Sequence, residues 1–131
     1  MRQKKKSTLL TEVELEFMTA IWEIGGGTVR EVMAILAPDR ALAYTSASTI
    51  LRILEQKEFL TSERAEKSFI YRPTINKPEY QSKSLRNLSE KLFDSTPSSL
   101  VARLVDDENM SEDMLQEIRA LLDKRLGKNA G

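Results

Sequence analysis

Apolar side chains recur at helical spacing in three segments of the first half of the chain. The first segment begins at Thr11, where Thr11 and Glu14 have the spacing of a capping box. A helix of about 13 residues follows, and the triple glycine 25–27 ends it because glycine is unfavourable inside helices. One face of this predicted helix carries Leu15, Met18, Ile21 and Trp22.

A second and a third helix are predicted by the same kind of pattern. Thr28 and Glu31 repeat the capping-box spacing and open a short second helix, which Pro38 closes. Its inner stripe is Val29, Val32, Met33 and Leu36. The loop Asp39–Tyr44 then leads to a third helix over residues 45–57. The buried stripe of that helix is Ala47, Ile50, Leu51 and Leu54.

The opposite face of the third helix is small and polar, and two short strands follow it. Phe59 and Leu60 begin the first strand, Arg64–Lys67 form a charged tip, and Ser68–Tyr71 form the second strand before Pro73. A helix with a short hydrogen-bonding face fits a DNA major groove, and a charged hairpin can straddle the phosphate backbone. This order predicts a winged helix-turn-helix. The predicted groove-facing side chains are Thr45, Ser46, Ser48, Thr49 and Arg52.

The pattern changes after the polar connector Thr74–Pro78. A helix is predicted from Glu79 to about Asp94, with Tyr80, Leu85, Leu88, Leu92 and Phe93 as inward positions. Thr96 and Pro97 predict the start of the next helix, which carries Leu100, Val101, Leu104 and Val105. Ser111 caps a last helix with Leu115, Ile118, Leu122 and Leu126 on one stripe, and Gly127 ends it.

This tail is small for an independent core, so its leucine stripes need a cover. A second copy of the chain is the preferred cover, and docking on the first domain is the alternative. The predicted fold is therefore mainly α with a small β-wing: a winged-helix domain over residues 1–74 and a three-helix dimerisation domain over 75–131. The predicted dimer contacts are Leu88, Leu92, Leu100, Leu104, Leu115, Ile118 and Leu122.

The amino-acid composition limits the kinds of active site and metal site that the chain can form. The chain has no cysteine and no histidine, which excludes disulfides and thiolate metal sites and removes the commonest metal ligand and general base. No nucleophile–base pair stands out, so neither an enzyme nor a cofactor is predicted. The acidic run 106–108 is interpreted as a solvated loop rather than a metal site. With no secretory signal and no apolar run of membrane length, a cytoplasmic location is expected.

Net charge is zero, so a DNA-binding role depends on local charge. Residues 1–75 hold 11 Lys and Arg against 10 Asp and Glu, a balance of only +1. Modest affinity per copy, and hence a dimer on DNA, is expected. The start of the chain is locally basic, and whether Lys4–Lys6 contact DNA or only solubilise the terminus is left open.

Three stretches resemble the penicillinase-repressor family of the BlaI, MecI and CopY type. They are LTEVELEFMTAIWEIGGGTVREVMAIL, AYTSASTILRILEQKEFL and SFIYRP, and the resemblance extends from Leu10 to Leu126. It implies an N-terminal winged helix, a helical C-terminal dimerisation domain and repression of antibiotic-resistance or copper-handling operons. Phosphate contacts are expected from the N-terminal amides of the second helix at Thr28, and from the wing at Arg64 and Lys67.

The chain departs from the family pattern at several positions. Glu58 replaces a usual glycine after the recognition helix, and Glu66-Lys67 replaces a usual Gly-Arg at the wing tip. The frequent family arginine of the third helix falls at Ile53, which bears on the role of Arg52. Copper sensing through thiolates is excluded because the chain has no cysteine.

The resemblance leaves the inducing partner open between a sensor protease and a small-molecule inducer. In the antibiotic-sensing branch a protease cuts an Asn-Phe-like bond, and the matching position here is Arg103-Leu104. That position lacks the pair, which predicts another cut or a ligand. The competing hypothesis for the whole chain is a helical protein-interaction adaptor whose winged domain binds protein instead of DNA.

Overall fold

The computed structural model describes residues 9–36 and 41–127. By their internal contacts the described residues form two compact units, which divide between Leu85 and Arg86. The first unit contains three helices, a two-stranded antiparallel hairpin and the start of a fourth helix. The helices are α1 (Glu12–Ile24), α2 (Val29–Leu36) and α3 (Tyr44–Gln56), and the strands are β1 (Leu60–Ala65) and β2 (Ser68–Pro73).

Local sequence signals account for the first two helices. At the start of α1 the Thr11 amide donates to Glu14 Oε1 over 2.9 Å, and the Glu14 amide donates to Thr11 Oγ1 over 3.1 Å. The same reciprocal bonds join Thr28 and Glu31 at the start of α2, so both predicted capping boxes are confirmed. Pro38, predicted to close α2, lies outside the described residues.

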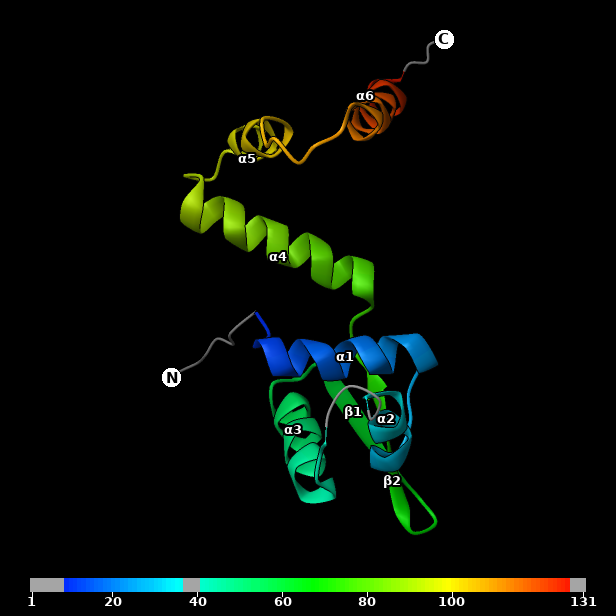
Figure 1. Ribbon diagram of the computed structural model, residues 1–131. Coiled ribbons are helices and arrows are strands. Elements are labelled where there is room, and N and C mark those ends of the chain that lie inside the picture. Colours follow the sequence, from blue (N-terminus) through cyan, green and yellow to red (C-terminus); the bar gives the residue numbers. More distant parts are fainter. Residues whose placement is uncertain (1–8, 37–40, 128–131) are drawn as a thin grey trace. The chain divides into compact units, whose positions relative to one another are not determined.

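The hairpin is attached to the helices through the loop that follows α1. Gly27 and Tyr71 exchange backbone hydrogen bonds of 2.9 and 2.8 Å, which pins β2 beside the start of α2. Glycine is required at Gly26, because its φ is 131° and an added Cβ would lie 2.9 Å from the Tyr71 carbonyl oxygen. Figure 1 shows α1 across one end of this unit and the hairpin turn projecting away from α1.

The core of the first unit is formed by residues of α1, α2, α3 and the hairpin. The predicted stripe of α1 was wrong at Leu15, which is 39% exposed. Phe17 and Ala20 are buried instead, because the elements packed on α1 cover a face rotated from the predicted one. The fully buried large side chains are Phe17, Met18, Ile21, Val32, Leu51, Leu54 and Leu60.

The end of α3 has the hydrogen bonds of a Schellman motif. The Phe59 amide donates to the Leu54 carbonyl and the Glu58 amide to the Glu55 carbonyl, each over 2.9 Å. Glu58 lies at the left-handed position of this motif with a φ of 72°. The sequence had placed Glu58 where glycine is expected, and the structure shows why glycine suits that position.

The helix α4 (Lys77–Leu92) begins two residues earlier than the predicted Glu79. Asn76 and Glu79 form a third capping box, with reciprocal bonds of 2.9 and 2.8 Å. Tyr80, buried as predicted, contacts the rings of Trp22 and Phe59 at centroid distances of 5.9 Å. The compact unit thus includes the start of α4 as well as the predicted winged-helix segment.

The second unit contains the end of α4 and two further helices, α5 (Pro97–Val105) and α6 (Glu112–Leu126). Ser111 caps α6 through the Met114 amide, and Gly127 ends it with a φ of 91°, as predicted. Thr96 occupies the cap position of α5, but its side chain makes no capping bond. No residue of α5 or α6 is buried in the single chain. No helix within the described ranges is long and apolar enough to cross a membrane.

Candidate nucleic-acid interface

The outer face of α3 carries the hydroxyl-bearing side chains singled out in the sequence. Ala47, Leu51 and Leu54 turn inward and are fully buried, which leaves the opposite face of the helix to solvent. Ser48 is half-buried beside that stripe. The exposed members of the predicted groove-facing set are Thr45, Ser46, Thr49 and Arg52.

An ion pair joins the C-terminal end of α3 to α1. Lys57, directly after α3, donates to both carboxylate oxygens of Glu14 on α1 over 2.9 Å. The C-terminal end of α3 is therefore held on α1, and its N-terminal end points the other way. The hairpin turn also projects away from α1, so the start of α3 and the wing tip lie at the same end of the unit (Figure 1).

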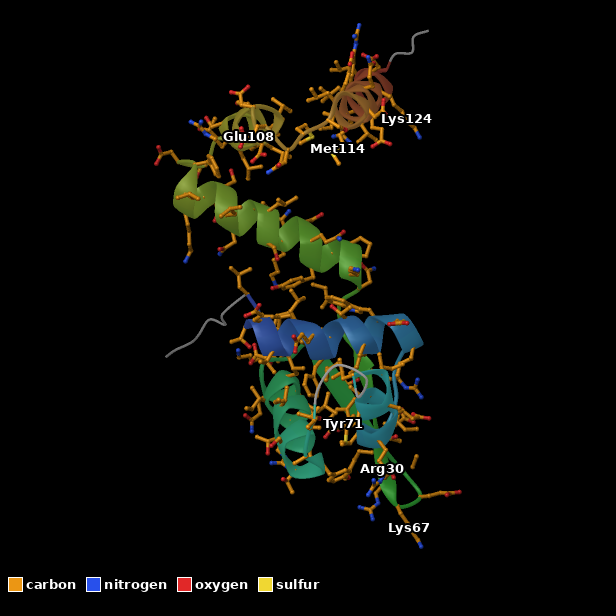
Figure 2. The ribbon with its side chains drawn as sticks, viewed as in Figure 1. Arg30, Lys67, Tyr71, Glu108, Met114 and Lys124 are labelled. Carbon is orange, nitrogen blue, oxygen red and sulfur yellow. The ribbon has the colours of Figure 1, made fainter. Side chains whose placement is uncertain are left out.

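Arg64 and Lys67, the two wing cations predicted to contact phosphates, are both exposed, and so is Arg72 of β2. Arg64 and Phe69 are paired across the hairpin, and the guanidinium carbon lies 5.6 Å from the centroid of the exposed ring. Lys67 lies at the turn, at the tip of the wing (Figure 2). Glu66 precedes it with a φ of 56°, so the first turn residue occupies a conformation that favours glycine. Glu66-Lys67 stands at the wing tip where the resembled family usually has Gly-Arg.

The N-terminus of α2, where a phosphate was expected at Thr28, is occupied by a carboxylate. Thr28 is half-buried, and its amide donates to Glu31 Oε1 over 2.9 Å. A carboxylate at this helix end satisfies the same donors that an anion would use. The phosphate contact of Thr28 stays a prediction, and it competes with Glu31.

Sequence reasoning missed the basic side chain of α2, Arg30. The guanidinium carbon of Arg30 lies 4.9 Å from the ring centroid of Tyr44, the first residue of α3. Arg30 is exposed, and the Tyr44 side chain is also exposed. Figure 2 places Arg30 at the same end of the unit as Lys67. No motif marks Arg30, because a contact between two helices leaves no periodic signal in the sequence.

Behind α3 lies Tyr71 of β2, whose side chain is buried. Burial raises the pKa of the Tyr71 phenol, and the nearby Glu55 carboxylate raises it further. Arg52 acts in the opposite direction on the same pKa, since a cation favours the phenolate. Tyr71 therefore remains a neutral hydroxyl across the physiological range.

The described residues hold no group of three or more acidic side chains that converge as metal ligands. The acidic run 106–108 is exposed and lies between α5 and α6. Residues 1–8, which include the basic start of the chain, lie outside the described residues, so the question whether Lys4–Lys6 contact DNA stays open.

A three-helix unit with an exposed third helix and a two-stranded wing is a winged helix-turn-helix, a DNA-binding class. The model of the penicillinase repressor family matches residues 10–124. The chain therefore belongs to the penicillinase repressor family, which consists of DNA-binding transcriptional repressors.

Individual relatives agree with this assignment. The chain is 23% identical over 120 residues to the methicillin resistance regulatory protein MecI of Staphylococcus aureus strain Mu50, covering 92% of this chain and 98% of MecI. It is 22% identical over 120 residues to the penicillinase repressor of Bacillus licheniformis, covering 92% of this chain and 94% of that repressor. The solution structure of the DNA binding domain of the repressor BlaI matches with a TM-score of 0.51 and 27% identity, over 60% of this chain and 94% of that one.

Proposed function

We propose that this chain represses transcription by binding a palindromic DNA operator as a homodimer, and that an inducing signal releases it. The observation that carries the proposal is the exposed hydroxyl face of α3, which begins at the same end of the unit as the wing tip. Membership in a family of DNA-binding repressors supports it.

In this proposal α3 enters the major groove. Thr45, Ser46, Ser48 and Thr49 present hydroxyls to base edges or phosphates, and the threonine methyl groups meet thymine methyls. Arg52, farther along the same face, takes a guanine or a phosphate. Only these side chains can specify sequence, since phosphate contacts fix position without reading bases.

The wing supplies contacts to the backbone. Arg64 and Lys67 are exposed and positively charged, and the ring of Phe69 restrains the Arg64 guanidinium. Glu66 opposes them, because its carboxylate at the turn repels phosphate. Because each winged-helix domain attracts DNA only weakly, tight binding requires a dimer that carries two such domains.

The tail is proposed as the dimerisation surface. Leu88, Leu92, Leu104 and Leu122 are all exposed in the single chain, and burying such side chains is the main driving force of association. The proposed contacts also include Leu100, Leu115 and Ile118. A two-fold dimer places two α3 helices in major grooves one helical turn, about 34–36 Å, or a multiple of it apart.

The test is a salt titration on duplex DNA from the chain's own upstream region, preceded by footprinting. Repressor binding weakens log-linearly with salt, because Lys and Arg release counterions from the phosphates. A footprint with two symmetric half-sites is the expected result. Absence of binding to any such fragment at low salt overturns the proposal and favours the protein-interaction adaptor.

The inducing signal is proposed to be either a sensor protease or a small-molecule inducer. Arg103 and Leu104, which match the family's cut by segment order, lie in the last turns of α5. They do not form the Asn-Phe-like pair that is cut in the antibiotic-sensing branch. We propose that induction does not use this bond. Co-expression with a cognate sensor protease under β-lactam exposure tests this, and a fragment ending at Arg103 contradicts it.

A further inference from the structure

The contact between Arg30 and Tyr44 joins the two helices of the helix-turn-helix where α3 begins. Arg30 lies in the first turn of α2, and Tyr44 is the first residue of α3. The guanidinium carbon lies 4.9 Å from the ring centroid, within the range in which a cation and an aromatic face attract each other. The contact is exposed to solvent, since Tyr44 retains 45% of its accessible surface.

The contact with Tyr44 leaves donors of Arg30 available. A guanidinium has five N–H groups, and a single aromatic ring cannot engage all of them. Among the described residues, no carboxylate forms an ion pair with Arg30. The charge of Arg30 is therefore held beside the Tyr44 ring and remains exposed to solvent.

The neighbouring groups explain why this charge matters for DNA. Glu31 occupies the N-terminus of α2 with a carboxylate, which opposes a phosphate there. Arg30 directly precedes Glu31, and it supplies a cation on the same turn of α2. It lies at the same end of the unit as Lys67 of the wing, whereas the C-terminal end of α3 is tied to α1 (Figure 2).

From this geometry we infer that Arg30 donates to a DNA phosphate beside the major groove, and that Tyr44 is the positioning residue that holds its guanidinium. The inference rests on the proposed DNA binding of α3. A restrained arginine loses less conformational freedom on binding than a free one, so the ring raises affinity without itself reading a base. The contact carries no sequence information, because phosphates are the same at every base pair.

The first test measures operator affinity against salt for Arg30→Gln. We expect binding to weaken about tenfold at moderate salt and the slope of log K against log salt to fall by about one, as one phosphate contact is lost. The loss should be the same on a random-sequence duplex. Lys77→Gln is the matched control: it removes an exposed cation at the start of α4, on the side of α1, and should leave the slope unchanged.

The second test separates stacking from charge. Tyr44→Phe keeps the ring and should bind within about twofold of wild type, whereas Tyr44→Leu should weaken binding about threefold with the salt slope retained. In the double variant, Tyr44→Leu should add nothing to Arg30→Gln, because the ring acts through the arginine. Circular dichroism and thermal melting of each variant confirm that the helices are intact.

The outcomes distinguish this inference from the function on which it rests. Wild-type binding with an unchanged slope in Arg30→Gln overturns the phosphate contact alone. Tyr44→Leu binding like wild type, or adding its full effect to Arg30→Gln, overturns the positioning role. Wild-type protein that shows no salt-dependent binding to any duplex overturns the proposed function and the inference together.

Discussion

Lys57 Nζ lies 2.9 Å from both carboxylate oxygens of Glu14, so the residue after the recognition helix is tied to the first turn of α1. Glu14 also accepts the Thr11 amide in the capping box. Burial of the Glu14 carboxyl raises its pKa, but the hydrogen bonds from Lys57 and Thr11 outweigh burial, and its pKa lies below the ordinary value.

A lowered pKa makes the stability of the fold depend on acid. Because the folded carboxyl binds its proton more weakly than the unfolded one, its contribution is present above the unfolded pKa and is lost as pH falls through the folded pKa. Glu14→Gln preserves a capping box but removes the charge. We expect it to lower the free energy of unfolding by about 1 kcal/mol at neutral pH and to reduce the loss of stability in acid.

Urea unfolding at a series of pH values from neutral to acid measures this difference. Glu23→Gln removes an exposed carboxylate from the same helix and serves as the control. If the free energy of unfolding changed with pH in the same way for wild type and Glu14→Gln, the lowered pKa of Glu14 would be contradicted.

Glu58 has a left-handed backbone conformation that disfavours any residue with a Cβ atom. With a φ of 72°, a side chain with Cβ is disfavoured by about 1 kcal/mol relative to glycine. We expect Glu58→Gly to be more stable than Glu58→Ala by about that amount, since both remove the carboxylate and only alanine keeps Cβ. Thermal melting of the two variants gives the comparison. Equal melting temperatures would show that the position carries no strain.

Glu66 combines strain and an unfavourable charge at the wing tip. Its φ of 56° favours glycine, and its carboxylate lies next to Lys67 in the segment proposed to meet phosphates. Glu66→Gly should raise both the melting temperature and DNA affinity, the latter by about threefold. Glu66→Gln should raise affinity alone. If neither variant binds DNA more tightly, the wing tip lies away from the backbone.

Recognition by α3 predicts different results for hydroxyls and for wing cations. Thr49→Ala and Ser46→Ala should each weaken operator binding by about 1–3 kcal/mol per lost base contact while random duplex binding is kept. Lys67→Gln should weaken binding to all sequences similarly and reduce the salt slope by about one. Competition of operator and random duplexes measures both. Unchanged operator affinity in both α3 variants would remove this face from the interface.

Assembly through the tail predicts a single disruptive substitution. Ile118 lies half-buried in α6 between Leu115 and Leu122 on one stripe. Ile118→Asp would place an unpaired charge in that contact, so we expect a monomer in analytical ultracentrifugation and weak operator binding. Gln116→Asp, at an exposed position of the same helix, is the control. A dimer of wild-type strength in Ile118→Asp would exclude this stripe.

Features encoded within a few residues were predictable from the sequence. The capping boxes at Thr11 and Thr28 are local signals of three-residue spacing, and the inner stripe of α3 follows from helical period alone. The start of α4 was missed although Asn76 and Glu79 carry the same signal. Pro78 was assigned to the connector, but proline is tolerated in the first turn of a helix.

Features that depend on which elements meet were not predictable. Leu15 and Phe17 are both apolar residues of α1, and only the packed elements decide that Phe17 is buried. The stacking of Arg30 on Tyr44 joins separate helices, so no periodicity marks it. Glu58 and Glu66 were recognised as departures from a family pattern, and their positive φ angles give those departures a physical meaning.

Trp22 is a natural fluorescent label, since the chain contains no other tryptophan. Its indole N–H donates over 2.8 Å to the Ile75 carbonyl, in the segment that joins the wing to α4. Indole emission shifts to longer wavelength when water replaces a protein partner. Fluorescence excited at the red edge of tryptophan absorption therefore reports on this junction alone, in the unlabelled protein, during DNA binding or induction.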